Sequence, residues 1–141
     1  MQQLKKFKIG SLEVGYRILL RKLEKDGYRL LSILPVNNRR YMIVKAEPEN
    51  FMIMYKREVF YNFGIQFRNK GYHGVGDTIN CTNLQTAIKN KVNRIFTIYP
   101  NGIVYTISME ELLINSISWI NKESKEVRSF SIHHYERRYE L

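Results

Sequence analysis

The sequence predicts one mixed α/β domain, and three observations support this. The chain has 141 residues, of which 44% are hydrophobic and 26% charged, an ordinary balance for a folded globular domain. Segments with apolar residues at helical spacing alternate with short, continuously apolar runs of strand length. No repeat, linker or low-complexity stretch divides the chain. We therefore expect residues 1–141 to form a single domain, with a mixed central sheet flanked by helices.

The first expected element is a helix from about Ser11 to Asp26. Ser11 is a favourable N-cap, and Gly27 follows the last turn, where a left-handed C-cap favours glycine. Apolar residues at helical spacing predict its buried face, which comprises Leu12, Tyr16, Leu19, Leu20 and Leu23.

Three strands are expected next, over residues 28–36, 41–46 and 51–57. The second and third are apolar on both faces, a pattern typical of strands that are covered on both sides. Residues 60–80 are rich in glycine, and we expect them to be irregular.

The second half of the chain should begin with a helix over residues 82–91, capped by Thr82. Strands over 94–99 and 103–107 follow, and the turn signal Pro100-Asn101-Gly102 predicts a hairpin between them. Ser108 and Glu111 form a capping box, which predicts a helix to about residue 120. Residues 127–134 alternate like an edge strand. The expected order is α-β-β-β-α-β-β-α-β.

The charge is the strongest global signal of function. Lys and Arg total 23 against 13 Asp and Glu, which gives a net charge of +10. Such a surplus attracts polyanions and favours a nucleic acid as the partner. The same charge is also consistent with a basic surface that only keeps the protein soluble. An anionic membrane surface as the partner is consistent with it too, but is less favoured.

The chain is expected to be cytoplasmic and not to insert into a membrane. No apolar run is long enough for a transmembrane helix, and the basic N-terminus lacks the apolar segment of a secretory signal. Cys81 is the only cysteine, which excludes an internal disulfide and a cysteine-rich zinc site.

Several groups of basic residues are candidates for contact with nucleic-acid phosphates. One is an N-terminal arm, one lies at a strand turn, one ends the third strand, and one flanks a glycine-rich segment with an aromatic ring that can stack on a base. Any one group alone is more typical of a solvated face. The candidates are Lys5, Lys6 and Lys8, then Arg39 and Arg40, then Arg57, and finally Arg68, Lys70, Tyr72 and His73.

The order helix, three-strand meander, helix, strand resembles the common core of the PD-(D/E)XK nuclease superfamily, which has the restriction-endonuclease-like fold. Gly10-Ser11-Leu12-Glu13, followed by the helix and by Asp26-Gly27-Tyr28, looks like the opening of archaeal Holliday-junction resolvases. Met54-Tyr55-Lys56 stands where that family has its Glu-x-Lys motif.

This resemblance implies a metal-dependent endonuclease acting on DNA or branched DNA. Mg²⁺ or Mn²⁺ would be the cofactor, since nucleases of this kind hold hard cations with carboxylate oxygens. Only Glu13 and Lys56 match the family's catalytic positions. Aspartates are rare in this chain, and the candidate replacement for the missing acidic residue is Asp77 or Glu58, with Glu13 and Asp77 as the candidate metal ligands. The resolvases that the chain resembles pair on two-fold junctions, so the resemblance also implies a homodimer.

The sequence also departs from the nuclease pattern. The second strand opens without an acidic residue, and Met54 replaces the glutamate of the motif with a side chain that does not bind hard cations. A catalytically inactive nucleic-acid-binding or assembly module therefore stays open, as does an RNA-binding protein. Each carboxylate also fits a simpler structural role: Asp77 as a turn or cap residue, Glu58 as an exposed charge, and Glu13 as a partner of Arg17.

Overall fold

The computed structural model describes residues 12–34, 41–56, 61–62, 75–121 and 123–141. Its centre is a six-stranded mixed sheet with the order β1-β2-β3-β6-β7-β10. Strands β3 and β6 are parallel, and the other neighbouring strands are antiparallel. The strands are β1 (Arg29–Leu34), β2 (Tyr41–Glu47), β3 (Phe51–Tyr55), β6 (Arg94–Ile98), β7 (Ile103–Ser108) and β10 (Glu136–Glu140).

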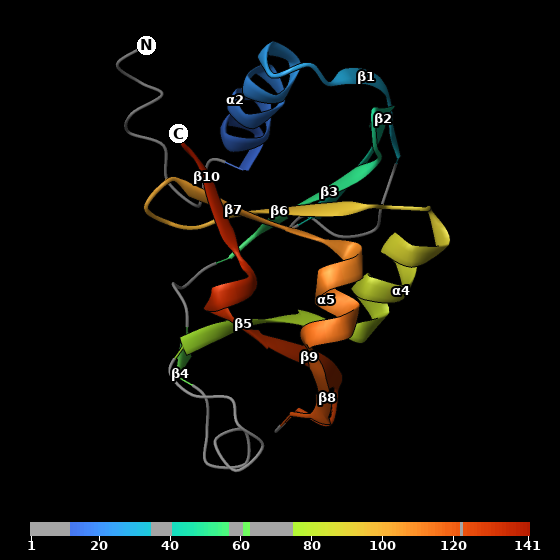
Figure 1. Ribbon diagram of the computed structural model, residues 1–141, viewed down its shortest axis with the longest axis vertical. Coiled ribbons are helices and arrows are strands. Elements are labelled where there is room, and N and C mark those ends of the chain that lie inside the picture. Colours follow the sequence, from blue (N-terminus) through green and yellow to red (C-terminus); the bar gives the residue numbers. More distant parts are fainter. Residues whose placement is uncertain (1–11, 35–40, 57–60, 63–74, 122) are drawn as a thin grey trace.

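Helices cover both faces of this sheet, as Figure 1 shows. Helix α2 (Leu12–Lys25) lies on one face, where Leu19 and Leu23 pack against Phe51 and Phe96. Helices α4 (Cys81–Lys89) and α5 (Met109–Asn115) lie on the other face. All residues of β3 are buried, because its two faces contact these two layers. The predicted mixed α/β class, with a central sheet flanked by helices, is confirmed.

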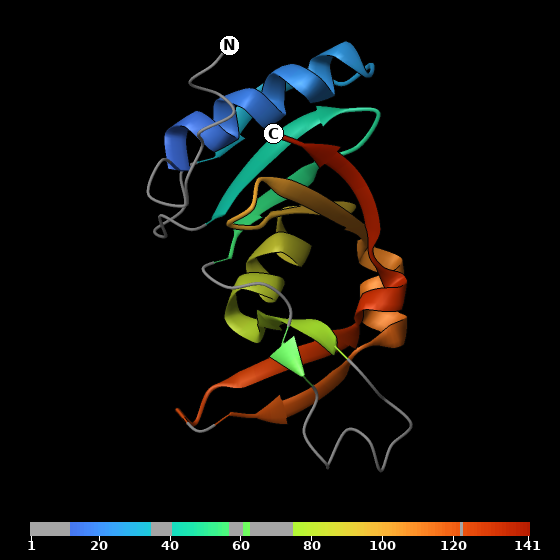
Figure 2. The same ribbon diagram turned by 90° about the vertical axis from the view of Figure 1, so that its left-hand side faces the viewer.

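A second sheet lies beyond α4 and α5 (Figures 1 and 2). It is antiparallel, with the order β4-β5-β9-β8. Its strands are β4 (Tyr61–Asn62), β5 (Val75–Asn80), β8 (Ile117–Ile120) and β9 (Glu126–Ser131). Ile79 and Phe130 join the core that α4 and α5 form against the central sheet. The sequence did not predict this sheet, and β4 and β5 fall in the segment expected to be irregular.

Two predicted boundaries in the second half are wrong. Helix α5 ends at Asn115 instead of near residue 120, because residues 117–120 pair with β9 as strand β8. The expected edge strand over 127–134 is β9, which lies inside the second sheet between β5 and β8. It ends at Ser131 and is followed by a 3₁₀ turn, Ile132–His134, and by the unpredicted strand β10.

The predicted chain reversals mostly hold. Gly27 ends α2 with a φ of +105°, and Gly102 has a φ of +83° in the hairpin between β6 and β7, both in the region that favours glycine. Ser108 caps α5 by accepting from the Glu111 backbone N–H. Helix α4 is capped by Asn80, the last residue of β5, and not by Thr82.

Among the described helices, none has the length and apolar character needed to span a bilayer.

Candidate functional site

Lys56 and Asp77, two of the predicted catalytic residues, meet where the two sheets approach each other. Lys56 directly follows β3. Its backbone N–H donates to the carbonyl of Ile98, so the hydrogen bonding to β6 continues through this residue. Asp77 lies within β5 of the second sheet. The Lys56 Nζ lies 3.1 Å from the Asp77 Oδ1. This ion pair connects the central sheet to the second sheet.

The Asp77 carboxylate is buried, with 5% of the residue exposed, and both its oxygens accept hydrogen bonds. Oδ1 accepts from the Thr78 backbone N–H at 2.7 Å, in addition to its contact with Lys56. Oδ2 accepts from the hydroxyls of Tyr99 and Tyr135. A buried carboxylate needs such compensation, because an unpaired charge in the interior is very costly. Asp77 is therefore not a turn or cap residue but an inward-facing strand residue.

Burial and the negative charge of Asp77 keep the two phenols protonated. The pKa of Tyr99 is raised well above its usual value, first by burial and then by the neighbouring Tyr135 and Asp77. The pKa of Tyr135 is raised as well, by burial and by Asp77. Tyr135 also shares a hydrogen bond of 2.9 Å with the Thr97 hydroxyl. Both phenols thus remain hydrogen-bond donors to the carboxylate.

We expect the protein to lose stability at alkaline pH because of these phenols. An unfolded tyrosine ionises near pH 10, whereas Tyr99 stays protonated in the folded chain. Its contribution is complete below about pH 10 and decreases above it, by at most about 1.4 kcal/mol per pH unit. Urea unfolding between about pH 8 and pH 11 measures the slope. Tyr99→Phe should flatten it, and an unchanged slope in that variant would contradict this assignment.

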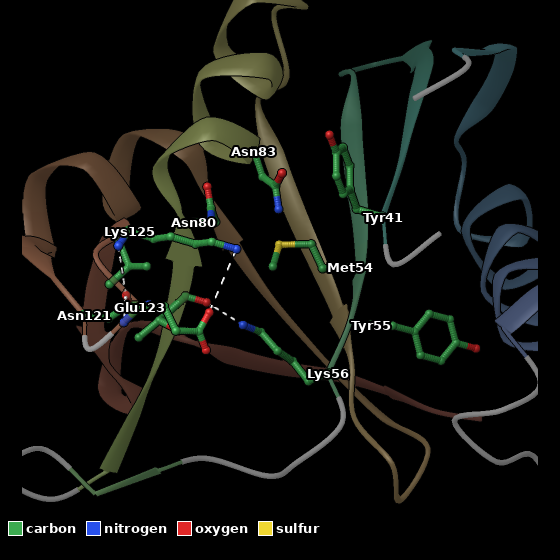
Figure 3. Close-up of a pocket in the computed structure, with 11 residues that line it drawn as sticks. Tyr41, Met54, Tyr55, Lys56, Asn80, Asn83, Asn121, Glu123 and Lys125 are labelled. Carbon is green, nitrogen blue, oxygen red and sulfur yellow. Dashed lines mark hydrogen bonds and ion pairs between the residues drawn. The ribbon is translucent and has the colours of Figure 1, made fainter. Parts of the chain in front are cut away.

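A pocket of about 380 Å³ opens beside Lys56, between the two sheets. We call it the intersheet pocket. Its walls come from β2 and β3, from β5, from the first turn of α4, and from the turn between β8 and β9 (Figure 3). The lining residues are Tyr41, Met54, Tyr55, Lys56, Thr78, Asn80, Asn83, Asn121, Glu123, Lys125 and Val127.

Two ammonium groups converge on this pocket from different walls, as Figure 3 shows. Lys56 is largely buried, and its Nζ donates to the Thr78 carbonyl as well as to Asp77. Lys125 is exposed and lies 3.9 Å from the exposed Glu123, a surface pair of the kind that contributes little. The first turn of α4 carries no acidic residue, so its N-terminus adds partial positive charge at the same edge. Paired ammonium groups beside a helix N-terminus can bind a phosphate, and the carboxylates of Glu123 in the pocket and Glu126 beside Cys81 lie in the same region.

The pocket also presents amide and hydroxyl groups. Asn80 caps α4, and the Asn121 Oδ1 holds the turn between β8 and β9 by accepting from the N–H groups of Glu123 and Lys125. The Asn83 carboxamide and the Tyr41 hydroxyl have no hydrogen-bond partner among the residues that the structure describes. Within the described part of the chain, neither group is therefore already used.

The donor set around Asp77 does not fit a divalent cation. Mg²⁺ and Mn²⁺ prefer several oxygen ligands, but both Asp77 oxygens already accept hydrogen bonds and the nearest charge is the Lys56 ammonium. Within the described residues, no three His, Cys, Asp or Glu side chains are grouped to hold a metal. Glu13 lies in the first turn of α2, with its side chain outside the described part, and Glu58 lies outside it altogether.

The predicted nucleic-acid contacts all lie outside the described residues: Lys5, Lys6, Lys8, Arg39, Arg40, Arg57, Arg68, Lys70, Tyr72 and His73. In turn, sequence reasoning missed Lys125 and Asn83. Lys125 belongs to a polar turn, and nothing local shows that this turn lies opposite Lys56. The only local signal was the preference of asparagine for the N-cap, which identifies Asn80.

No family model, curated protein or solved structure matches the chain.

Proposed function

We propose that the chain is a nucleic-acid-binding protein with DNA as its preferred partner, and that the intersheet pocket contacts the phosphate backbone. The observation that carries this proposal is the convergence of Lys56 and Lys125 on one polar pocket. The net charge of +10 supports it, because cationic side chains that neutralise phosphates release counterions and so favour binding.

The topology is consistent with a nuclease-like scaffold. Helix α2, the antiparallel strands β1 to β3, helix α4 and strand β6 follow one another in the order that the resemblance implies, with the β4–β5 segment inserted before α4. Strand β6 adds parallel to β3, and Lys56 directly follows β3. We propose that this chain uses such a scaffold for binding.

The side-chain contacts of Asp77 favour binding without catalysis. The Asp77 carboxylate is buried and satisfied by Lys56, Tyr99 and Tyr135. A carboxylate in that state has no oxygen free for a metal-bound water or a substrate. We therefore propose a mode of binding that uses no divalent cation at Asp77.

A metal-dependent endodeoxyribonuclease is the second candidate. The observation in its favour is the 3.1 Å contact between Lys56 and Asp77, which joins a predicted catalytic lysine to a predicted metal ligand. This candidate requires Mg²⁺ or Mn²⁺, and it requires further carboxylates, for which Glu13 and Glu58 are the predicted residues.

One experiment separates the two candidates. The protein is incubated with labelled duplex, single-stranded and four-way-junction DNA, and with an RNA duplex, in magnesium, in manganese and in chelator. Retardation and strand scission are scored in every arm. We expect retardation of DNA that chelator does not change, and no scission. Metal-dependent scission would establish the endonuclease instead, stronger retardation of RNA would change the partner, and no retardation of any probe would refute nucleic-acid binding.

A further inference from the structure

We infer that the intersheet pocket accepts one unstacked nucleotide, so that the protein prefers single-stranded or branched DNA with an unpaired base over a fully paired duplex. The inference rests on the proposed function and names the form of nucleic acid that the pocket recognises.

The size of the pocket is the first argument. Its volume of about 380 Å³ lies at the lower end of the range for small-ligand pockets, roughly 300–1,000 Å³. One nucleotide fits such a volume, whereas a paired and stacked base cannot leave the duplex to reach it without losing its partners. A second recess of about 560 Å³ continues past Asn80 and Asn83 along the start of α4. This recess leaves room for the neighbouring nucleotides of the bound DNA strand.

One wall of the pocket has the chemistry to hold a base. Tyr41 and Met54, from β2 and β3, face Asn83 of α4 across the pocket (Figure 3). The tyrosine ring is a surface on which any base can stack. The Asn83 carboxamide offers both donors and an acceptor, which match the hydrogen-bonding edge that a base exposes only when it is unpaired.

The two lysines place the phosphate at the other side of the pocket. Lys56 is held in position by Asp77 and by the Thr78 carbonyl, so its ammonium is pre-organised. Lys125 reaches in from the turn between β8 and β9, and its exposure allows it to follow the backbone. A nucleotide bound with its base at Tyr41 and Asn83 has its phosphate near these two ammonium groups.

The test uses three DNA probes that each carry one 2-aminopurine: a single strand, a fully paired duplex, and the same duplex with the 2-aminopurine unpaired. Fluorescence anisotropy gives the affinity, and the base emission reports its surroundings. We expect the single strand and the unpaired probe to bind about tenfold more tightly than the paired duplex. The emission should change on binding only for these two probes.

Three substitutions test whether the intersheet pocket is the site that binds the unpaired base. Asn83→Ala should remove the preference while affinity for the paired duplex changes by less than about twofold. Tyr41→Phe keeps the ring and loses the hydroxyl, so it should retain the emission change. Asn93→Ala is the matched control, because Asn93 is exposed and precedes β6 at the end of the sheet opposite Lys56. Circular dichroism and thermal unfolding check that each variant is folded.

The possible failures are distinguishable. Equal affinity for the three probes would overturn this inference and leave the proposed function intact, whereas absence of binding to every probe would overturn the proposed function itself. A preference that survives in Asn83→Ala, or one that Asn93→Ala also loses, would show that the unpaired base binds elsewhere.

Discussion

Asp77→Ala should lower the free energy of unfolding by about 3–5 kcal/mol, the range for removing one partner of a buried ion pair. The variant leaves the largely buried Lys56 ammonium without its carboxylate and removes the acceptor of the Tyr99 and Tyr135 hydroxyls. These contacts join β5 to the central sheet, so the second sheet should loosen as well. Urea unfolding followed by circular dichroism gives the change in free energy.

Two further variants make this result interpretable. Asp77→Asn keeps the shape and one accepting oxygen but loses the charge, so its loss of stability should be smaller. Glu123→Ala removes an exposed carboxylate of the same pocket region and should change stability by about 0.5 kcal/mol or less. A neutral or stabilising effect of Asp77→Ala would contradict this prediction. The carboxylate would then destabilise the fold, as active-site residues often do, and this result would favour the endonuclease candidate.

The parts of the fold that the sequence predicted are those with local causes. The buried face of α2 follows from apolar spacing, and its end follows from Gly27. The doubly covered β3 follows from an uninterrupted apolar run. The second sheet has no such signal, since β5 contains Gly76 and Asp77, which are weak strand formers. It becomes a strand by pairing with β9, about fifty residues further along the chain.

The site was predictable only in part for the same reason. Lys56 could be singled out because it follows the third strand of the meander, and Asp77 because aspartates are rare in this chain. The contact between them, and the two phenols that satisfy Asp77, depend on the packing of one sheet on the other. The partner of Lys56 in the pocket, Lys125, lies in a turn whose sequence indicates only solvent exposure. Single residues of the candidate site can therefore be identified from the sequence, but their convergence in space cannot.

Lys125→Glu should weaken DNA binding on the order of tenfold and reduce the dependence of affinity on salt by about one unit of the logarithmic slope. The change replaces one of the two ammonium groups at the pocket by a carboxylate. Because the Lys125 side chain is exposed, we expect the fold to tolerate the replacement. Fluorescence anisotropy with the single-stranded probe, at several salt concentrations, measures both quantities.

Lys89→Glu is the control for this variant. It makes the same change in net charge at the last turn of α4, whereas the pocket lies at the first turn of that helix. If DNA is held only by the general charge of +10, the two variants should weaken binding equally. A loss confined to Lys125→Glu would instead place a phosphate in the pocket, because only a short-range contact distinguishes two exposed lysines of the same protein.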